Sequence, residues 1–297
     1  MNAELRQHAA RYVELLRRHG KKEAWLPTGL ARRLPSSSTS STSAPIRSAP
    51  APVSKQETSP VVRNTTTIAS PKPKNDFDLN SILQGVSGSK TDKLAALRKK
   101  TEVCKICPHL AKSRTQVVFG VGDPEAKLMF VGEAPGAEED KQGEPFVGLA
   151  GKLLTKMITA MELTREQVYI ANVLKCRPDM PANTSGHRKP TRTEMDTCLP
   201  YLRAQVAIIA PTVIVALGST AVEGLFGPQK TTISRLRGTW MELDGVPVRP
   251  TFHPSYLLHN QDLALKRLVW TDLLAAMEKL SLPISEKQRG FFLKPAA

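Results

Sequence analysis

The chain has 297 residues, 42 Lys and Arg against 27 Asp and Glu, and a formal net charge of +15. The length allows one or two domains with a full hydrophobic core, and the charge favours a polyanionic partner such as nucleic acid over a merely basic tail. No apolar run approaches the ~20 residues that span a membrane, and the charges scattered through residues 1–20 exclude a secretory signal. The expected location is therefore the cytoplasm.

The N-terminal part divides into a helix and a linker. Residues 3–19 repeat apolar side chains at helical spacing, which predicts an amphipathic helix within a basic segment, residues 1–33. Residues 34–77 are rich in Ser, Thr and Pro, so they bury too little apolar surface to offset their ordering entropy and are expected to be disordered. A folded domain is expected over residues 78–282, followed by a tail, residues 283–297.

Strands and helices alternate in the expected domain, which begins with a helix over residues 91–101. Strands are predicted at residues 116–119, 128–131, 168–173, 213–217 and 246–250, and further helices at residues 149–161, 193–209, 220–226 and 262–280. Continuous apolar strands that alternate with helices indicate an α/β fold, with a mostly parallel sheet covered on both faces.

Small and polar residues follow four of these strands where each strand ends. They are Glu133–Gly136, Asn172, Gly218–Thr220 and His253. In parallel α/β sheets, ligands bind at the carboxyl ends of the strands. The sequence therefore predicts one pocket to which carboxylate, amide and imidazole groups contribute.

The four cysteines are Cys104, Cys107, Cys176 and Cys198. In a reducing compartment they are expected to be metal ligands or buried thiols rather than disulfides. The C-x-x-C pair forms a good two-ligand hairpin, and the fold has to bring the other two cysteines to it. Four thiolates suit either a tetrahedral zinc ion or an iron–sulfur cluster, and four unrelated thiols are the alternative.

Three segments carry a resemblance to a known family. They are GEAPGAEEDKQGEPFVGLAGKLL from residue 132, YIANVLKCRP from residue 169 and FHPSYLL from residue 252. With the cysteine arrangement, they resemble the family 4 uracil-DNA glycosylases, the iron–sulfur type, over about residues 94–280. The resemblance implies a three-layer α/β/α sandwich around a short, mostly parallel sheet. It also implies a [4Fe–4S] cluster on the four cysteines and removal of uracil from DNA by cleavage of its N-glycosidic bond, leaving an abasic site for base excision repair.

The resemblance implies roles for three side chains of the pocket. Phe146 would stack on a flipped uracil, and Asn172 would read the uracil edge, because an amide both donates and accepts. His253 would donate to the charge that develops on a uracil carbonyl as the base leaves. A core plug, a turn residue and a buried histidine are the respective alternatives.

The loop after residue 132 is expected to shape the pocket. Glu133 and the backbone at Ala134 would orient the base and the attacking water, and Gly136 lets backbone pass close to the base. Better-known members of the superfamily have an aspartate where this chain has Ala134, which leaves Glu133 as the candidate for water positioning. Glu139 is expected near the pyrimidine C5 position, where it would reject the methyl group of thymine.

Two sets of residues are expected to contact DNA. Basic loop residues would bind phosphates, and a turn after His253 would press into the minor groove as a wedge. The first set is Arg177, Arg188, Lys189 and Arg237, and the second is Ser255, Tyr256 and Leu257. Solvated loops and a helix-capping turn are the alternatives.

The C-terminal segment Gln288–Leu293 suggests one further partner. Its glutamine followed by an apolar pair resembles the short peptides by which repair enzymes engage bacterial sliding clamps. The predicted function is thus a monomeric, monofunctional uracil-DNA glycosylase acting on single- or double-stranded DNA. A protein that binds uracil-DNA without turnover and an iron–sulfur protein for electron transfer or redox sensing are the rivals.

Overall fold

The structure, a computed structural model, describes residues 84–180 and 186–293. The predicted N-terminal helix and linker, residues 1–33 and 34–77, lie outside the described residues. None of the helices in the described ranges is both long enough and apolar enough to cross a membrane.

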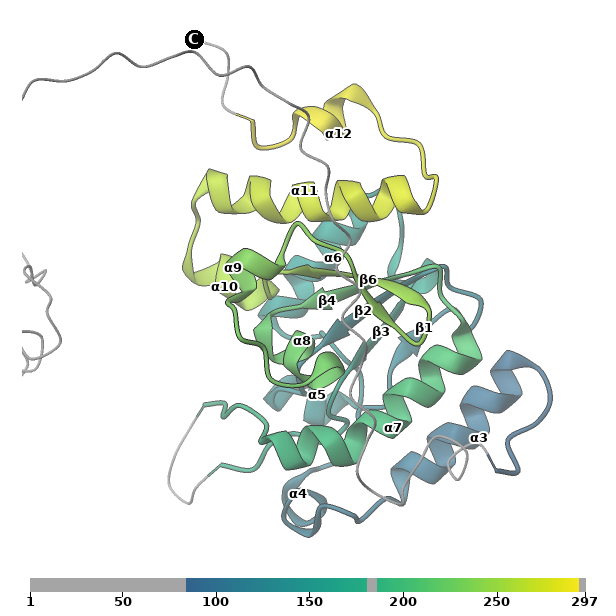
Figure 1. The fold of residues 1–297 in the computed structure, drawn as a ribbon. Helices are drawn as coiled ribbons and strands as arrows, with labels where there is room; N and C mark the ends of the chain where they lie inside the picture. The colour runs from purple at the N-terminus through teal and green to yellow at the C-terminus, as the bar shows by residue number, and fades with distance from the viewer. Residues whose placement is uncertain (1–83, 181–185, 294–297) are drawn as a thin grey trace, which may run out of the picture. The chain divides into compact units, whose positions relative to one another are not determined.

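A six-stranded sheet lies at the centre of the described fold (Figure 1). The strands are β1 (Val121–Gly122), β2 (Leu128–Gly132), β3 (Tyr169–Asn172), β4 (Val213–Leu217), β5 (Met241–Leu243) and β6 (Val246–Thr251). Their spatial order is β1-β3-β2-β4-β6-β5, in which the four inner strands are parallel and the two edge strands are antiparallel to their neighbours. This confirms the mostly parallel sheet.

Helices cover both faces of the sheet. They are α3 (Lys90–Glu102), α4 (Pro108–Ser113), α5 (Ala137–Gln142), α6 (Leu149–Ala160), α7 (Arg192–Ile209), α8 (Ser219–Phe226), α9 (Ile233–Leu236), α10 (Pro254–His259), α11 (Leu263–Lys279), α12 (Glu286–Gly290) and the 3₁₀ turn η1 (Arg165–Gln167). The five helices predicted from periodicity begin and end within one residue of these bounds. The short helices α4, α5, α9, α10 and α12 were not predicted.

The two faces of the sheet bury different side chains because successive strand residues point to opposite faces. In β2, Leu128 and Phe130 pack with apolar residues of α6 and α11. Met129 and Val131 pack instead with residues of α3, α7 and α8. Both faces of the inner strands are therefore core, which is why these strands read as continuous apolar runs and why the α/β/α sandwich is confirmed.

The strand predicted at residues 116–119 is wrong. Val117, Val118 and Phe119 are buried, but they do not form a β-ladder. The Val118 N–H instead donates a backbone hydrogen bond to the carbonyl of Lys175. The place beside β3 is taken by the two-residue strand β1, at Gly122, where the φ of +126° and the absence of a Cβ permit close pairing. Residues 117–119 are apolar because they form a buried connecting segment, not because they form a strand.

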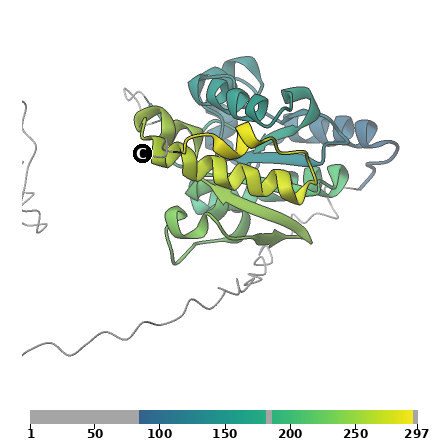
Figure 2. The ribbon, with the colours of Figure 1, turned by 90° about the horizontal axis from the view of Figure 1, so that it is seen from above.

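Part of the predicted tail packs on the domain. The Gln288 side chain donates to the Ala160 carbonyl at 3.0 Å, and the Trp270 indole donates to the Gln288 carbonyl at 2.6 Å. The Phe291 ring lies 5.2 Å from that of Trp270. Figure 2 shows α12 lying alongside α11.

Candidate active site

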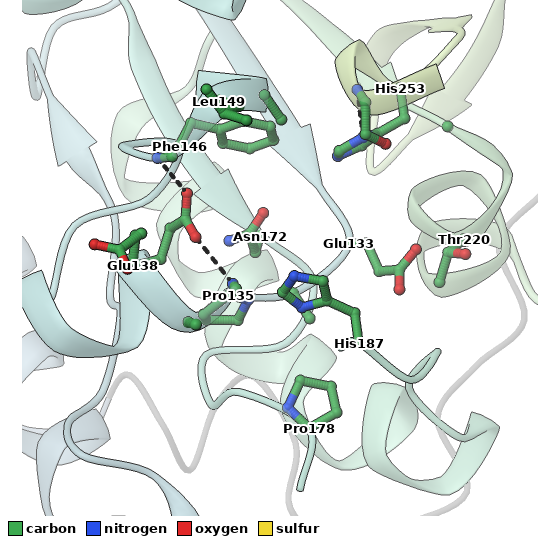
Figure 3. A pocket seen from close by; sticks show the side chains of 18 of the residues that line it. Glu133, Pro135, Glu138, Phe146, Leu149, Asn172, Pro178, His187, Thr220 and His253 are labelled. Atoms are coloured by element: carbon green, nitrogen blue, oxygen red, sulfur yellow. Dashed lines mark hydrogen bonds between the residues drawn. The ribbon is translucent and has the colours of Figure 1, made fainter. Parts of the chain in front are cut away.

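One cavity of about 790 Å³ opens at the carboxyl ends of the inner strands. Its walls include groups from all four predicted strand ends: the loop after β2, Asn172 at the end of β3, the turn after β4 and His253 after β6 (Figure 3). The registers explain the convergence, because Gly132 pairs with Asn172 and Leu217 pairs with Thr251 across neighbouring parallel strands. The structure thus brings the predicted pocket residues together.

Phe146 forms one wall of the cavity and is held there by backbone geometry. It has a φ of +56°, rare for a residue with a side chain, and it is buried. Two glycines make room for it. A Cβ at Gly151 would lie 1.8 Å from the Phe146 carbonyl oxygen, and one at Gly132 would lie 2.5 Å from the tip of the ring. Glycine is therefore required at both places to seat the ring.

Glu139 links the loops around Phe146 through hydrogen bonds to their backbones. One of its carboxylate oxygens accepts from the N–H groups of Val147 and Gly148, at 3.0 and 2.9 Å, and the other accepts from the Gly136 N–H at 3.1 Å. The expectation that Glu139 rejects a thymine methyl gains no support from these contacts, because both oxygens hold backbone. The carboxylate instead sets the spacing between the loop after β2 and the loop that carries Phe146.

Asn172 presents an unpaired acceptor to the cavity. The residue is only 2% exposed, and its Oδ1 is one of two buried side-chain atoms in the described ranges without a hydrogen-bond partner. An unpaired buried polar atom costs about 1–3 kcal/mol, so it is rarely left without a reason. A ligand N–H bound in the cavity would satisfy it.

His253 is fixed in one tautomer. The Ser255 backbone N–H donates to Nδ1 at 3.2 Å, and the Ser255 hydroxyl lies 2.7 Å from the same nitrogen. Since a backbone N–H can only donate, Nδ1 is the acceptor and the ring proton is on Nε2. Burial lowers the pKa of His253 to about 4, against a smaller opposing effect of Glu139. The ring is therefore neutral at pH 7, and its centroid lies 5.7 Å from that of Phe146.

Glu133 lies across the cavity, as Figure 3 shows, near Thr220 and His187. Burial raises the pKa of its carboxyl, while a hydrogen bond from Thr220 and the charges of Lys189 and His187 oppose the rise. Ala134 and Gly136 also line the cavity. The N-cap of α8 is Gly218, with a φ of +91°, and the Thr220 hydroxyl is hydrogen-bonded to Glu133.

Several predicted phosphate-binding residues are engaged within the protein. Arg188 pairs with Asp179 and with Glu194, and Lys189 pairs with Glu223 at 2.5 Å. These pairs leave Arg188 little freedom to contact phosphate, although it lines the cavity.

The guanidinium of Arg237 is bonded to Asp272 at 2.9 Å, and its side chain is only 11% exposed. It joins α11 to the segment before β5, and this pairing does not favour the prediction of Arg237 as a DNA contact. Arg177 is only partly exposed, and the structure gives it no ion pair among the described residues.

The predicted wedge turn is the short helix α10. Leu257 is 5% exposed and packs in the core, which does not favour its prediction as a groove contact. Ser255 contacts Nδ1 of His253 through both its hydroxyl and its backbone N–H. Tyr256 is 49% exposed, with its ring 5.3 Å from that of Phe252, so it remains at the surface.

The four cysteines line a second, smaller cavity together with Arg114 and Tyr201. Arg114 donates to the Cys176 sulfur at 3.0 Å, and the Lys175 N–H lies 3.2 Å from the Cys198 sulfur. Burial, and then the neighbouring sulfurs, raise the pKa of Cys107 to about 11 and that of Cys198 to about 12. Four sulfurs around one cavity, with N–H donors aimed at two of them, fit the thiolate donor set of zinc or an iron–sulfur cluster.

Lys175 stands between the two cavities. It is buried, and burial lowers its pKa to about 7. Its ammonium donates to the Asn172 carbonyl at 2.9 Å and to the Gln205 side chain at 2.5 Å. Gln205 in turn donates to the Phe119 carbonyl and to the Tyr169 hydroxyl. This buried chain of hydrogen bonds joins the end of β3 to the cysteine-bearing segment.

A group of His109, Asp179 and Glu194 has the spacing of metal ligands. The guanidinium of Arg188 bonds both acids, so an arginine already supplies the positive charge there. The Nε2 of His109 lies 2.7 Å from an oxygen of Glu194, so these side chains form one network of polar contacts.

Leu149, Pro178, His187 and Leu258 are among the residues that line the active-site cavity and were not predicted. Leu149 and Leu258 read as ordinary apolar residues of helices, and Pro178 and His187 come from loops whose path the pattern does not reveal. The only feature of the sequence that pointed to any of these residues is the basic character of the segment around residue 187.

Comparison with known proteins places these features in a family context. Residues 119–274 match the Uracil DNA glycosylase superfamily. The chain is 46% identical over 176 residues to the type-4 uracil-DNA glycosylase of Thermotoga maritima, covering 59% of this chain and 88% of that protein. It is 47% identical over 167 residues to the type-4 enzyme of Archaeoglobus fulgidus, covering 54% and 80%, respectively. The match to the type-4 enzyme of Sulfurisphaera tokodaii is 44% over 180 residues, covering 58% and 79%.

Proposed function

Because the chain belongs to the uracil-DNA glycosylase superfamily, we propose that it is a monofunctional uracil-DNA glycosylase, which excises uracil from DNA for base excision repair. The observation that carries the proposal is that Asn172 and His253, with complementary hydrogen-bonding groups, line the same cavity. The unpaired Asn172 oxygen is an acceptor for a ring N–H, and the neutral His253 ring offers its Nε2–H to a carbonyl. Uracil has both groups on one edge.

The proposed reaction begins with uracil flipped from the stack onto Phe146. The bond between the sugar C1′ and the base N1 breaks, and its electron pair leaves with the base. The His253 Nε2–H donates a hydrogen bond to the carbonyl oxygen on which this negative charge develops. Water oriented by Glu133 and the backbone at Ala134 bonds to C1′, and its proton passes to the carboxylate and then to solvent. The products are an abasic site and the uracil anion, which takes up a proton from solvent to become free uracil.

A uracil-release assay tests this function. A single-stranded and a duplex oligonucleotide, each with one uracil, are incubated with the protein and then treated with alkali, and thymine oligonucleotides serve as controls. Strand cleavage confined to uracil is expected. Tight binding without cleavage would favour the uracil-DNA binding protein, and reversible redox behaviour without base release would favour the electron-transfer protein. Either result overturns the proposal.

We propose that Cys104, Cys107, Cys176 and Cys198 hold a [4Fe–4S] cluster. Their common cavity and the N–H donors at two sulfurs support this choice. A bound cluster would supply a covalent link between three chain segments. The aerobically or anaerobically purified protein is expected to be brown and to contain about four iron atoms per chain. Cys198→Ser is expected to lose iron and to melt at a lower temperature. A colourless protein with one zinc ion per chain would show that the site holds zinc and not a cluster.

Glu139→Gln is expected to lower kcat/KM for uracil release about tenfold or more, because one of the two oxygens that hold three backbone N–H groups becomes an amide donor. The displaced loop would leave Phe146 poorly placed for stacking. Glu144→Gln, an exposed carboxylate of the same loop, is the matched control and is expected to retain wild-type kinetics. Equal kinetics in the two variants would contradict the fastening role.

We propose that the segment Gln288–Leu293 binds a sliding clamp, which requires a rearrangement of Gln288. Phe292 and Leu293 are 42% and 57% exposed, but Gln288 is buried against Ala160. A clamp would therefore have to release the glutamine before binding it. Phe292→Ala is expected to abolish capture by an immobilised clamp, and unchanged capture would end the idea. We further propose that the protein acts as a cytoplasmic monomer on uracil in single- or double-stranded DNA.

A further inference from the structure

Arg165 is not among the residues that line the active-site cavity, but it is bonded to the segment that carries Phe146. It is the first residue of η1 and is half-buried. Its Nη2 donates to the Pro145 carbonyl at 2.9 Å, and its Nη1 donates to the Thr155 hydroxyl at 3.2 Å. Because both acceptors are neutral oxygens, these bonds only partly offset the cost of taking the charge out of water, and burial lowers the pKa of Arg165. Packing alone therefore does not explain an arginine here.

The two bonds of Arg165 hold a backbone that is unfavourable by itself. Phe146 directly follows Pro145 and has a φ of +56°, which a residue with a side chain keeps only where its surroundings impose it. The Thr155 hydroxyl in turn donates to the Gly151 carbonyl at 3.1 Å, and Gly151 is the residue against which the Phe146 backbone packs. One arginine thus holds the residue before the ring and, through Thr155, the turn of α6 behind it.

The same arginine stands at the entry to the strand that carries Asn172. Only residue 168 separates η1 from β3, and β3 ends at Asn172. A Cβ at Gly132 would lie 2.4 Å from Oδ1 of Asn172 and 2.5 Å from the tip of the Phe146 ring. The ring and the amide therefore meet at one point of the cavity wall, as Figure 3 shows. Arg165 joins the two chain segments that bring them there.

We propose that Arg165 is a positioning residue for uracil recognition, which holds the Phe146 ring in place against a base that Asn172 reads. The inference rests on the proposed function. A stacking ring contacts the base before and during cleavage of the glycosidic bond, so its placement affects binding more than the chemical step. Loss of Arg165 therefore raises KM and changes kcat little.

The test compares Arg165 with Arg203, a second half-buried arginine that joins two segments. Arg203 donates to Asp244 at 2.8 Å, and neither of these two residues lines the active-site cavity. Arg165→Gln is expected to raise KM for single-stranded uracil DNA about fivefold to tenfold, part of what base–aromatic stacking contributes, and to lower kcat less than about twofold. Arg203→Gln is expected to keep both constants. Arg165→Lys, which can keep one of the two bonds, is expected to lie between wild type and Arg165→Gln.

A milder pair of variants tests the same contact without removing the charge. Thr155→Val removes the hydroxyl that accepts from Arg165 but keeps the shape of the side chain, and Thr155→Ser keeps the hydroxyl. Valine is expected to raise KM about threefold, the usual effect of one lost hydrogen bond, and serine to leave it unchanged. Melting temperatures verify that all variants fold.

A double-mutant cycle shows whether Arg165 acts through Phe146. The measured quantity is the dissociation constant of a single strand with one 2′-fluoro-2′-deoxyuridine, which resists cleavage because fluorine destabilises an oxocarbenium-like sugar. It is expressed relative to the same strand with thymine, so that any phosphate contact of Arg165 cancels. Arg165→Gln is expected to weaken this relative binding about fivefold to tenfold in wild type. In Phe146→Leu the same substitution is expected to weaken it less than about twofold.

Three results would overturn the positioning role. A wild-type KM together with a lower melting temperature in Arg165→Gln would make Arg165 a structural residue only. A fall in kcat without a rise in KM would place it in the chemical step, and additive losses in the cycle would mean that it acts apart from Phe146. Each of these results needs a wild type that releases uracil, whereas the proposed function fails when wild type releases none.

Discussion

His253→Ala is expected to lower kcat for uracil release by about a hundredfold to a thousandfold, the usual effect of removing a donor to a developing anion. The reason is the fixed tautomer, in which Nδ1 accepts from the Ser255 N–H and Nε2 carries the proton into the cavity. His253→Gln is expected to lose less, because an amide N–H can partly replace the donor. Single-turnover measurements with saturating enzyme report the chemical step directly.

The pH dependence provides a control for this assignment. With a pKa of about 4, His253 stays neutral above about pH 5. Activity that depends on the neutral donor is therefore expected to be flat from about pH 5.5 to 8 as far as this residue is concerned. If the imidazolium were the active form, activity would instead fall as the pH rises through the range where the residue loses its proton. Ser255→Ala, which keeps the backbone N–H, is expected to lose only a few-fold.

Asn172→Leu is expected to separate activity from stability. Leucine has a similar shape but no polar atoms, so it cannot read the uracil edge, and kcat/KM is expected to fall by about a hundredfold or more. The melting temperature is expected to equal or exceed that of wild type, because the substitution removes a buried oxygen without a partner. Such a trade-off is typical of functional sites.

The comparison for Asn172→Leu is a core residue of similar size. Leu154 is fully buried, so Leu154→Ala is expected to lose about 2–5 kcal/mol of unfolding free energy, measured by urea denaturation. If Asn172→Leu were destabilised to the same extent, Asn172 would be a structural residue. Full activity in that variant would remove it from base recognition.

The elements that the sequence predicted well are those whose apolar pattern is imposed by two buried faces. Helix α7 and strand β4 were placed within one residue, because most buried positions of α7 and all residues of β4 are apolar. The pocket was predictable for a related reason. Parallel strands end at one edge of the sheet, so Asn172 and His253 had to lie at the same edge.

The contacts that could not be predicted from the sequence are those between residues that are distant in the chain. Arg237 and Asp272 are 35 residues apart, and nothing local distinguishes a buried pair from two solvated charges. The same holds for Glu139, whose backbone partners Val147 and Gly148 become neighbours only through the path of the loop. The burial of Leu257 could not be predicted either, because the sequence does not tell which leucine of a short turn faces inward.

The position of Lys175 has a consequence for how the molecule opens. Its ammonium and its backbone N–H join the carbonyl of Asn172 to the sulfur of Cys198, so the base-binding wall and the cysteine cavity share one buried layer. Local fluctuations that loosen one would break hydrogen bonds of the other. In native-state hydrogen exchange, amides of β3 and of the neighbouring turns of α7 should therefore exchange through a common opening, with the same dependence on denaturant.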